Sequence, residues 1–317
     1  CELYNSLVKL YKFSRPLQNN FVRSSKTSFF KRTIKKNKTM ATATKGYDLT
    51  VNVNNINLSY DDFGEGSTPI VFLHGFPFDK SMWQEQLDFF KSTHRVIALD
   101  IRGFGKSTDE ESHLSMDLFA NDLILFIDRL GLEKVILCGL SMGGFIALNA
   151  MKRFPSRFEA LILCDTQCIA DSYDVKVNRY KAISDINEFG ASNFNEGFLK
   201  KVFHESSITE KPELVEQLRK VVFSNSQHII TQGLIALAER SETCSVLNDI
   251  SIPTLIICGR EDVVTPLDES KFMNKNIKSS VLHVITNAGH VSNLEEPVKF
   301  NKHLRNFLSD FCDASGK

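Results

Sequence analysis

The segment GLSMGG, Gly139 to Gly144, places a serine between glycines where the apolar run KVILC gives way to a helix-like stretch. A tight turn from strand to helix forces its central residue into sparsely populated backbone conformations, at a cost of about 1–3 kcal/mol. Gly139 and Gly143 leave room for neighbouring chain because they carry no side chain. The pattern therefore predicts that Ser141 stands at a strained corner, with its hydroxyl raised above a sheet.

A serine hydroxyl becomes a useful nucleophile only when a base removes its proton and a third group orients that base. His290, in NAGH after the last apolar run, is the predicted base, with a loop histidine bonded to backbone as the alternative. Asp262, in GREDVVTP after the preceding run, is the predicted acid. Glu261 and Asp165 remain as alternatives for the acid. The chain order of serine, acid and histidine fits a known arrangement of such groups.

Acyl transfer also needs N–H donors for the negative oxygen that develops in the transition state. The N–H of Met142, directly after the serine at a helix start, is the first predicted donor. The second is the N–H of Phe76, in HGFP, where His74 and Gly75 begin a sharp turn. We expect His74 to be a buried support for this turn and not a proton carrier.

Short apolar runs separated by helical patterns predict strands that are buried on both faces. A hairpin is expected at residues 49–55 and 56–62, and Ser115 and Gly131 are expected to begin and end a helix. Such strands indicate a mostly parallel sheet flanked by helices, with its chemistry at the carboxyl ends of the strands. The expected buried strands are residues 70–75, 95–100, 134–139, 160–165, 254–259 and 281–286.

The alternation stops for about eighty residues after Asp165, where the apolar pattern is helical throughout. An all-helical block inserted into such a frame predicts a cap over the working edge of the sheet. The expected domains are a core of residues 46–166 and 247–317 and a cap of residues 167–246. The expected cap helices are residues 175–189, 194–203, 213–223 and 228–240.

Residues 1–45 form a separate basic extension, with eleven Lys and Arg residues and one acid, Glu2. Three interpretations stay open: translated upstream sequence before Met40, a mitochondrial-type presequence over residues 1–39, or a functional basic arm. The remaining chain has a formal net charge of −10, which argues against binding to nucleic acid or to an anionic membrane. No apolar run approaches the roughly 20 residues of a membrane helix. We expect a cytoplasmic protein, or a mitochondrial one if the presequence is real.

The seven cysteines are scattered, and an odd number without paired spacing predicts buried thiols in a reducing compartment instead of disulfides or a zinc site. Gly105-Lys106-Ser107 is not a phosphate-binding loop, because Asp100 stands where that loop needs glycine. Trp83, the only tryptophan, is expected either to line a pocket or to pack in the core. No metal site is predicted, and the chain is expected to be a monomer or homodimer.

From about Asp48 to Phe311 the chain resembles α/β-hydrolase-fold enzymes, and within them the capped 3-oxoadipate enol-lactonases and small carboxylesterases. The resemblance implies a serine triad, a helical lid and no cofactor. The expected function is hydrolysis of a carboxylic ester or lactone of a small molecule. The alternatives are a small-molecule sensor with weak turnover, a perhydrolase and a C–C bond hydrolase. The matching segments are HGFPFD at 74–79, DIRGFGKS at 100–107, GLSMGG at 139–144, GREDVVTP at 259–266 and NAGH at 287–290.

Overall fold

The computed structural model describes residues 45–109 and 113–315, with only the main chain described for residues 310–315. The predictions for the basic extension, residues 1–45, therefore fall outside the described residues except at Lys45. None of the described helices has the length and hydropathy that are needed to cross a membrane.

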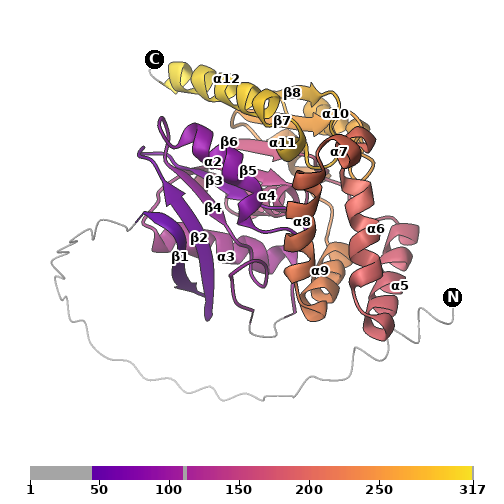
Figure 1. Cartoon of the computed structure of the whole chain (residues 1–317). Coiled ribbons are helices and arrows are strands. Elements are labelled where there is room, and N and C mark those ends of the chain that lie inside the picture. The colour runs from indigo at the N-terminus through magenta and orange to yellow at the C-terminus, as the bar shows by residue number, and fades with distance from the viewer. Residues whose placement is uncertain (1–44, 110–112, 316–317) are drawn as a thin grey trace, which may run out of the picture. The chain divides into compact units, whose positions relative to one another are not determined.

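The described chain is built on an eight-stranded sheet with the order β1-β2-β4-β3-β5-β6-β7-β8 (Figure 1). The pairs β1–β2 and β2–β4 are antiparallel, and every pairing from β4 to β8 is parallel, which confirms the predicted hairpin and mostly parallel sheet. Asn54 and Asn55 both have positive φ, 48° and 64°, as a two-residue hairpin turn of type I′ requires. The strands are β1 (Gly46–Val53), β2 (Ile56–Phe63), β3 (Ile70–Leu73), β4 (Val96–Leu99), β5 (Val135–Leu140), β6 (Phe158–Cys164), β7 (Thr254–Gly259) and β8 (Ser280–Ile285).

Helices cover both faces of the sheet, and an apolar cluster lies between each face and its helices. The hydroxyl of Ser115 accepts the N–H of Leu118 at 3.1 Å, so this residue caps the helix α3 as predicted, and Gly131 follows its end with φ 67°. The helices of this frame are η1 (Lys80–Trp83), α2 (Gln84–Phe90), α3 (Met116–Arg129), α4 (Met142–Arg153), η2 (Pro155–Arg157), α10 (Leu267–Asn276), α11 (Ser292–Glu295) and α12 (Pro297–Ser315).

Trp83 is fully buried under the sheet and belongs to one of these clusters. Its ring lies 4.9 Å from that of Phe72 on β3 and 6.1 Å from that of Phe300 on α12, measured between centroids. Of the two predicted roles, the structure therefore favours core packing over a place in a pocket.

We call the helical insertion between β6 and β7 the cap, and its helices gather on the right of Figure 1. Four of its five helices match predicted ones. The short α7 was not predicted, because six residues are too few to display a helical period. The cap helices are α5 (Tyr173–Phe189), α6 (Ser192–Val202), α7 (Glu205–Glu210), α8 (Pro212–Ser224) and α9 (Gln227–Glu239), followed by η3 (Cys244–Asp249).

A disulfide joins the two ends of the cap, and here the prediction of free thiols is wrong. Cys168, just after β6, is bonded to Cys244, the first residue of η3. The two are 76 positions apart, a separation that carries no pairing signal in the sequence. Cys138, Cys164 and Cys258 are buried free thiols, as expected.

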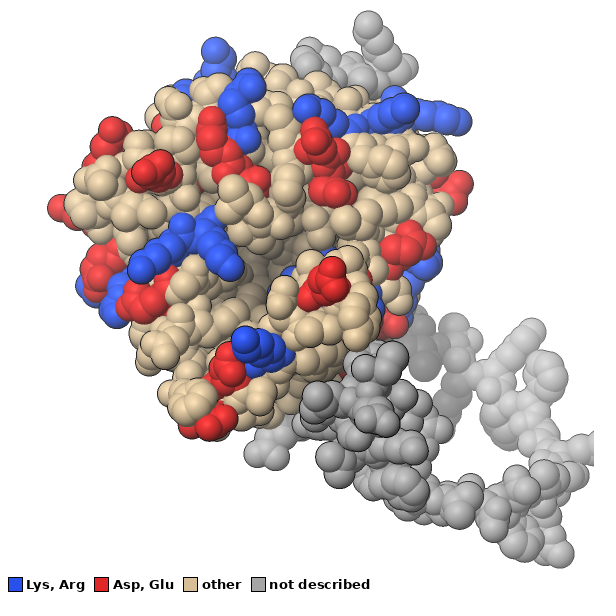
Figure 2. Space-filling view, turned by 90° about the vertical axis from the view of Figure 1, so that its right-hand side faces the viewer, with Lys and Arg blue, Asp and Glu red and all other residues tan. Residues whose placement is uncertain are grey.

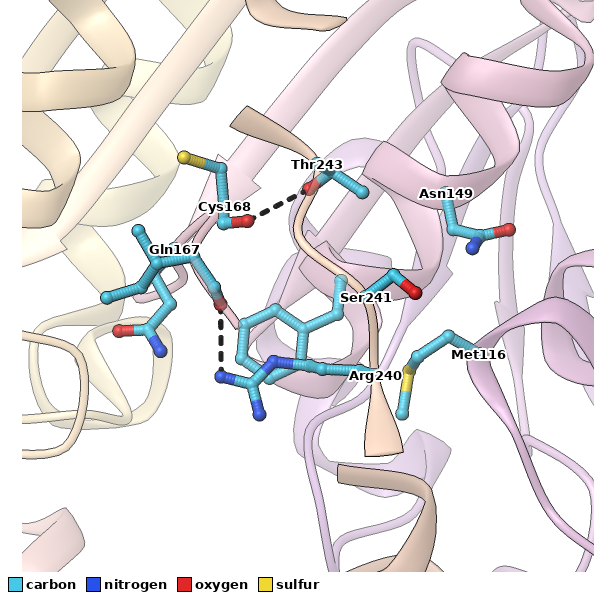
Figure 3. A pocket seen from close by; sticks show the side chains of 9 residues that line it. Met116, Asn149, Gln167, Cys168, Arg240, Ser241 and Thr243 are labelled. Atoms are coloured by element: carbon cyan, nitrogen blue, oxygen red, sulfur yellow. Dashed lines mark hydrogen bonds between the residues drawn. The ribbon is translucent and has the colours of Figure 1, made fainter. Parts of the chain in front are cut away.

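The base of the cap also holds a small hollow beside this disulfide (Figure 3). The N–H of Thr243 donates to the carbonyl of Cys168 at 2.8 Å, and Arg240 lies over the ring of Phe145 at 4.4 Å. The hollow has a volume of about 10 Å³, enough for roughly one water molecule. It is too small to receive an organic substrate.

Candidate functional site

Ser141 is the single residue between the end of β5 and the start of α4, and its backbone has φ 53° and ψ −115°. A Cβ at Gly139 would lie 2.3 Å from the carbonyl oxygen of Gly143, and a Cβ at Gly143 would lie 2.3 Å from that of Leu73. Both positions therefore exclude any side chain. The strained serine and its two glycines agree with the geometry expected from the sequence.

The structure brings Ser141, His290 and Asp262 together, although the serine and the histidine are 149 positions apart. Nε2 of His290 lies 2.8 Å from Oγ of Ser141, and Nδ1 lies 2.8 Å from Oδ2 of Asp262. Since a carboxylate only accepts hydrogen bonds, the proton of the neutral imidazole is on Nδ1. This leaves the lone pair of Nε2 directed at the serine hydroxyl.

The electrostatics of this pair favour a carboxylate beside a basic imidazole. Burial opposes ionisation of Asp262, but the charge and hydrogen bond of His290 hold its pKa below the ordinary value. Burial alone would lower the pKa of His290, whereas the charge and hydrogen bond of Asp262 raise it above 6.5 on balance. His290 is therefore a stronger base than a free imidazole.

Neither alternative acid is bonded to His290. One oxygen of Asp165 accepts the N–H of Gly259 at 2.7 Å, and the other lies 2.6 Å from the hydroxyl of Ser292. Burial, with the nearby charge of Asp262, raises the pKa of Asp165 from its ordinary value of 3.8 to about 8. Glu261 accepts the N–H of Ala288 at 3.2 Å.

Two threonines for which the sequence predicted no role complete this arrangement. The hydroxyl of Thr265 donates to Oδ2 of Asp262 at 2.7 Å, and its N–H donates to Oδ1 at 3.0 Å. The hydroxyl of Thr166 donates to the carbonyl of Ser141 at 2.8 Å. A threonine three residues after an acid in a turn is a signal that could have identified Thr265.

The two predicted N–H donors flank the serine on separate segments. Met142 is the first residue of α4, directly after Ser141. Phe76 follows Gly75, where a Cβ would lie 3.2 Å from Cβ of Ser141. Within the described residues neither N–H has a protein acceptor. Both are therefore available to an oxygen bound beside the serine.

His74 supports the turn that carries Phe76. It is completely buried, Nε2 accepts the N–H of Ile101 at 2.9 Å, and Nδ1 lies 2.8 Å from the carbonyl of Gly75. The carboxylate of Asp100 holds the same region, since it accepts the N–H of Lys80 at 2.7 Å and that of Lys106 at 2.9 Å. The GKS segment is thus part of this support.

One group of described residues has the composition of a metal site: ligand atoms of Asp165, Cys258 and Asp262 lie within 4.8 Å of one another. Both carboxylates are already engaged in the hydrogen bonds given above. The thiol of Cys258 donates to the carbonyl of Gly259 at 3.1 Å, and burial raises its pKa well above the usual range. A protonated thiol is a poor metal ligand, so the group does not fit a bound ion.

Comparisons with known proteins show which family the chain resembles. The family model for the alpha/beta hydrolase fold matches residues 68–297. The chain is 29% identical to 3-oxoadipate enol-lactonase 2 of Acinetobacter baylyi over 263 residues, covering 83% of this chain and 97% of the relative. It is 32% identical to the AB hydrolase superfamily protein YisY of Bacillus subtilis, covering 80% and 95%.

A solved structure of a thermophilic esterase from Thermogutta terrifontis matches with a TM-score of 0.79 and 32% identity, covering 85% of this chain and 99% of that one. The range that the family model matches, residues 68–297, includes Ser141, Met142, Asp262 and His290. The chain therefore belongs to the α/β hydrolase fold family.

Proposed function

We propose that this protein is a serine hydrolase that cleaves a carboxylic ester or lactone of a small molecule through an acyl-enzyme. The observation that carries the proposal is the continuous hydrogen-bonded chain from Ser141 through His290 to Asp262 at a strained corner. The enol-lactonase and esterase similarities support the same reaction class.

In this mechanism Oγ of Ser141 attacks the carbonyl carbon while Nε2 of His290 takes the hydroxyl proton. The carbonyl oxygen becomes negative and accepts hydrogen bonds from the N–H groups of Phe76 and Met142. His290 then gives its proton to the departing alcohol oxygen, and the carbon–oxygen bond of the ester breaks. Water, deprotonated by His290, attacks the serine ester. The bond between the acyl carbon and Oγ then breaks, His290 returns the proton to Oγ, and the acid is released. Asp262 remains ionised and stabilises the imidazolium in both halves.

The surroundings of Phe76 favour an apolar substituent on the substrate. Its ring lies 6.2 Å from that of Phe198 and 6.4 Å from that of Phe194, both on α6 of the cap. A Cβ at Gly233 on α9 would lie 2.5 Å from the same ring, so the cap packs closely on it. Viewed from the cap side, the molecule is hollowed near the centre of that face, with acidic and basic residues interspersed around it (Figure 2). We therefore expect uncharged acyl or alcohol groups to be preferred.

The raised pKa of His290 predicts the pH dependence of the reaction. Attack requires an unprotonated Nε2. Asp262 favours the protonated imidazole, so as the pH falls His290 takes up its proton at a pH above 6.5. We expect kcat/KM for a neutral ester to fall as the pH drops through a pKa above 6.5. A pH profile of p-nitrophenyl butyrate hydrolysis measures this. An acid limb centred below 6.5 would contradict the raised pKa of His290.

The proposed function is tested by combining covalent labelling with turnover on a panel of esters and lactones. We expect a fluorophosphonate probe to label the protein and short p-nitrophenyl esters to be hydrolysed with multiple turnovers. Labelling with turnover near the uncatalysed rate across the whole panel would favour the sensor. The absence of both labelling and turnover would refute the hydrolase.

A further inference from the structure

The loop that carries His290 lies directly against the cap. The N–H of His290 donates to the carbonyl of Val202, the last residue of α6, at 2.8 Å. At the preceding residue, Gly289, a Cβ would lie 2.8 Å from that same oxygen and 2.9 Å from the nitrogen of His204. The approach is thus too close for any side chain. The α6–α7 junction of the cap and the histidine loop are therefore in main-chain contact.

A single carboxylate connects these two segments. Glu295, the last residue of α11, is 1% exposed. Its Oε1 accepts the N–H of His204 at 2.7 Å, and its Oε2 accepts the N–H of Gly289 at 2.6 Å. The side chain of Ser207, on α7, hydrogen-bonds to the same carboxylate. One partner thus lies next to His290 and two lie in the cap.

We propose that Glu295 is a positioning residue, whose carboxylate ties the cap to the loop of His290 and so fixes the imidazole between Ser141 and Asp262. This inference rests on the proposed function, since it concerns the placement of the base in that reaction. It assigns no contact with substrate to Glu295. It implies that the cap takes part in aligning the base as well as in selecting the substrate.

The chemistry of the link requires a carboxylate of this length. A carboxylate offers two acceptor oxygens, whereas the amide of glutamine offers one acceptor and directs its NH₂ group at the other N–H. An aspartate keeps the charge but is one methylene shorter, so it does not reach both N–H groups. Reach and charge can therefore be separated by two substitutions at one position.

The charge of Glu295 also affects the pKa of the His290 imidazole. The acidic groups that raise the pKa of His290 are Asp262 first, then Asp165 and Glu295. On its other side, Glu295 faces the imidazole of His204, and the amino group of Lys211 hydrogen-bonds to its main-chain oxygen. Loss of the carboxylate charge should therefore move the acid limb of the pH profile to lower pH, an effect that packing alone would not produce.

The test compares Glu295→Gln and Glu295→Asp with the wild-type protein, using p-nitrophenyl acetate. We expect both variants to lower kcat by about 10- to 100-fold, since small misplacements of a catalytic group have effects of this size. KM should stay within about threefold, because Glu295 makes no contact with substrate. Only Glu295→Gln should shift the acid limb. Thermal unfolding of each variant shows whether it is folded.

The matched control is Glu296→Gln, which removes a neighbouring carboxylate that pairs with Lys211 and Lys299. It should leave kcat within about twofold of wild type. A folded Glu295→Gln protein with wild-type kcat, or an equal loss in Glu296→Gln, would overturn the positioning role. A wild-type protein that neither labels nor turns over would instead refute the proposed function itself.

If Glu295→Gln does not fold, Ser207→Ala supplies the test with a milder change. Ser207 is 1% exposed, and its replacement removes one hydrogen-bond donor to the carboxylate of Glu295. The adjacent Ser206, whose hydroxyl bonds to Nδ1 of His204, is its control. We expect kcat to fall several-fold in Ser207→Ala and to stay unchanged in Ser206→Ala. Equal kcat values for both variants and the wild type would overturn the inference.

Discussion

Replacing Ser141 with alanine is expected to lower kcat for ester hydrolysis by about four to six orders of magnitude and to abolish fluorophosphonate labelling. The reason is that the variant has no oxygen to attack the carbonyl carbon, while the oxyanion donors alone give only weak catalysis. The fold should persist, since the Ser141 side chain makes no capping hydrogen bond to α4. Steady-state kinetics and intact-mass analysis after labelling measure both effects.

An exposed serine provides the control for this experiment. Ser81→Ala changes an exposed side chain on η1, whose hydroxyl donates to the carboxylate of Asp79. It should label and turn over like the wild type. If Ser141→Ala retained labelling, another nucleophile would have to be sought, and the proposed acyl-enzyme would be wrong. The Ser141→Ala protein also suits a screen of metabolite pools, because bound substrate would survive on it.

The second large effect is expected at the acid. Asp262→Asn should lower kcat by about 10⁴-fold, because an amide presents an NH₂ group to Nδ1 and favours the tautomer with the proton on the wrong nitrogen. The expected loss is close to that seen when the equivalent aspartate of a serine protease is changed in this way. Measurement of kcat with saturating p-nitrophenyl butyrate tests it.

Asp165→Asn is the control for this variant, because Asp165 was an alternative candidate for the acid. Its carboxyl group is hydrogen-bonded to Gly259 and Ser292 and makes no hydrogen bond to His290, so an amide of nearly the same shape should replace it with less than about tenfold loss of kcat. The reverse ranking, with Asp165→Asn the more damaged protein, would transfer the role of acid to Asp165.

The sequence was sufficient to predict that Ser141, Asp262 and His290 lie together, because their positions follow from local rules. Parallel strands end at one edge of a sheet, so residues just after β5, β7 and β8 had to meet there, whatever their separation along the chain. The glycines at 139 and 143 were informative for the same reason: a close backbone approach excludes side chains at those two positions and leaves a visible pattern.

The features that were missed depend on contacts between distant segments. Cys168 and Cys244 meet only because the cap begins and ends at the same place, and nothing in their spacing records it. Glu295 accepts hydrogen bonds from the main-chain N–H groups of residues 204 and 289. Every residue except proline has such a group, so the sequence contains no signal for these contacts. The aromatic contacts of Phe76 with α6 likewise required the cap to be placed over the core.

The disulfide at the base of the cap makes the insertion a covalently closed ring. A protease that cuts a single exposed peptide bond between Cys168 and Cys244 would leave two fragments that remain joined as long as the bond is oxidised. Such nicked protein would keep its full mass in a denaturing gel and would separate into two bands only after a reductant is added.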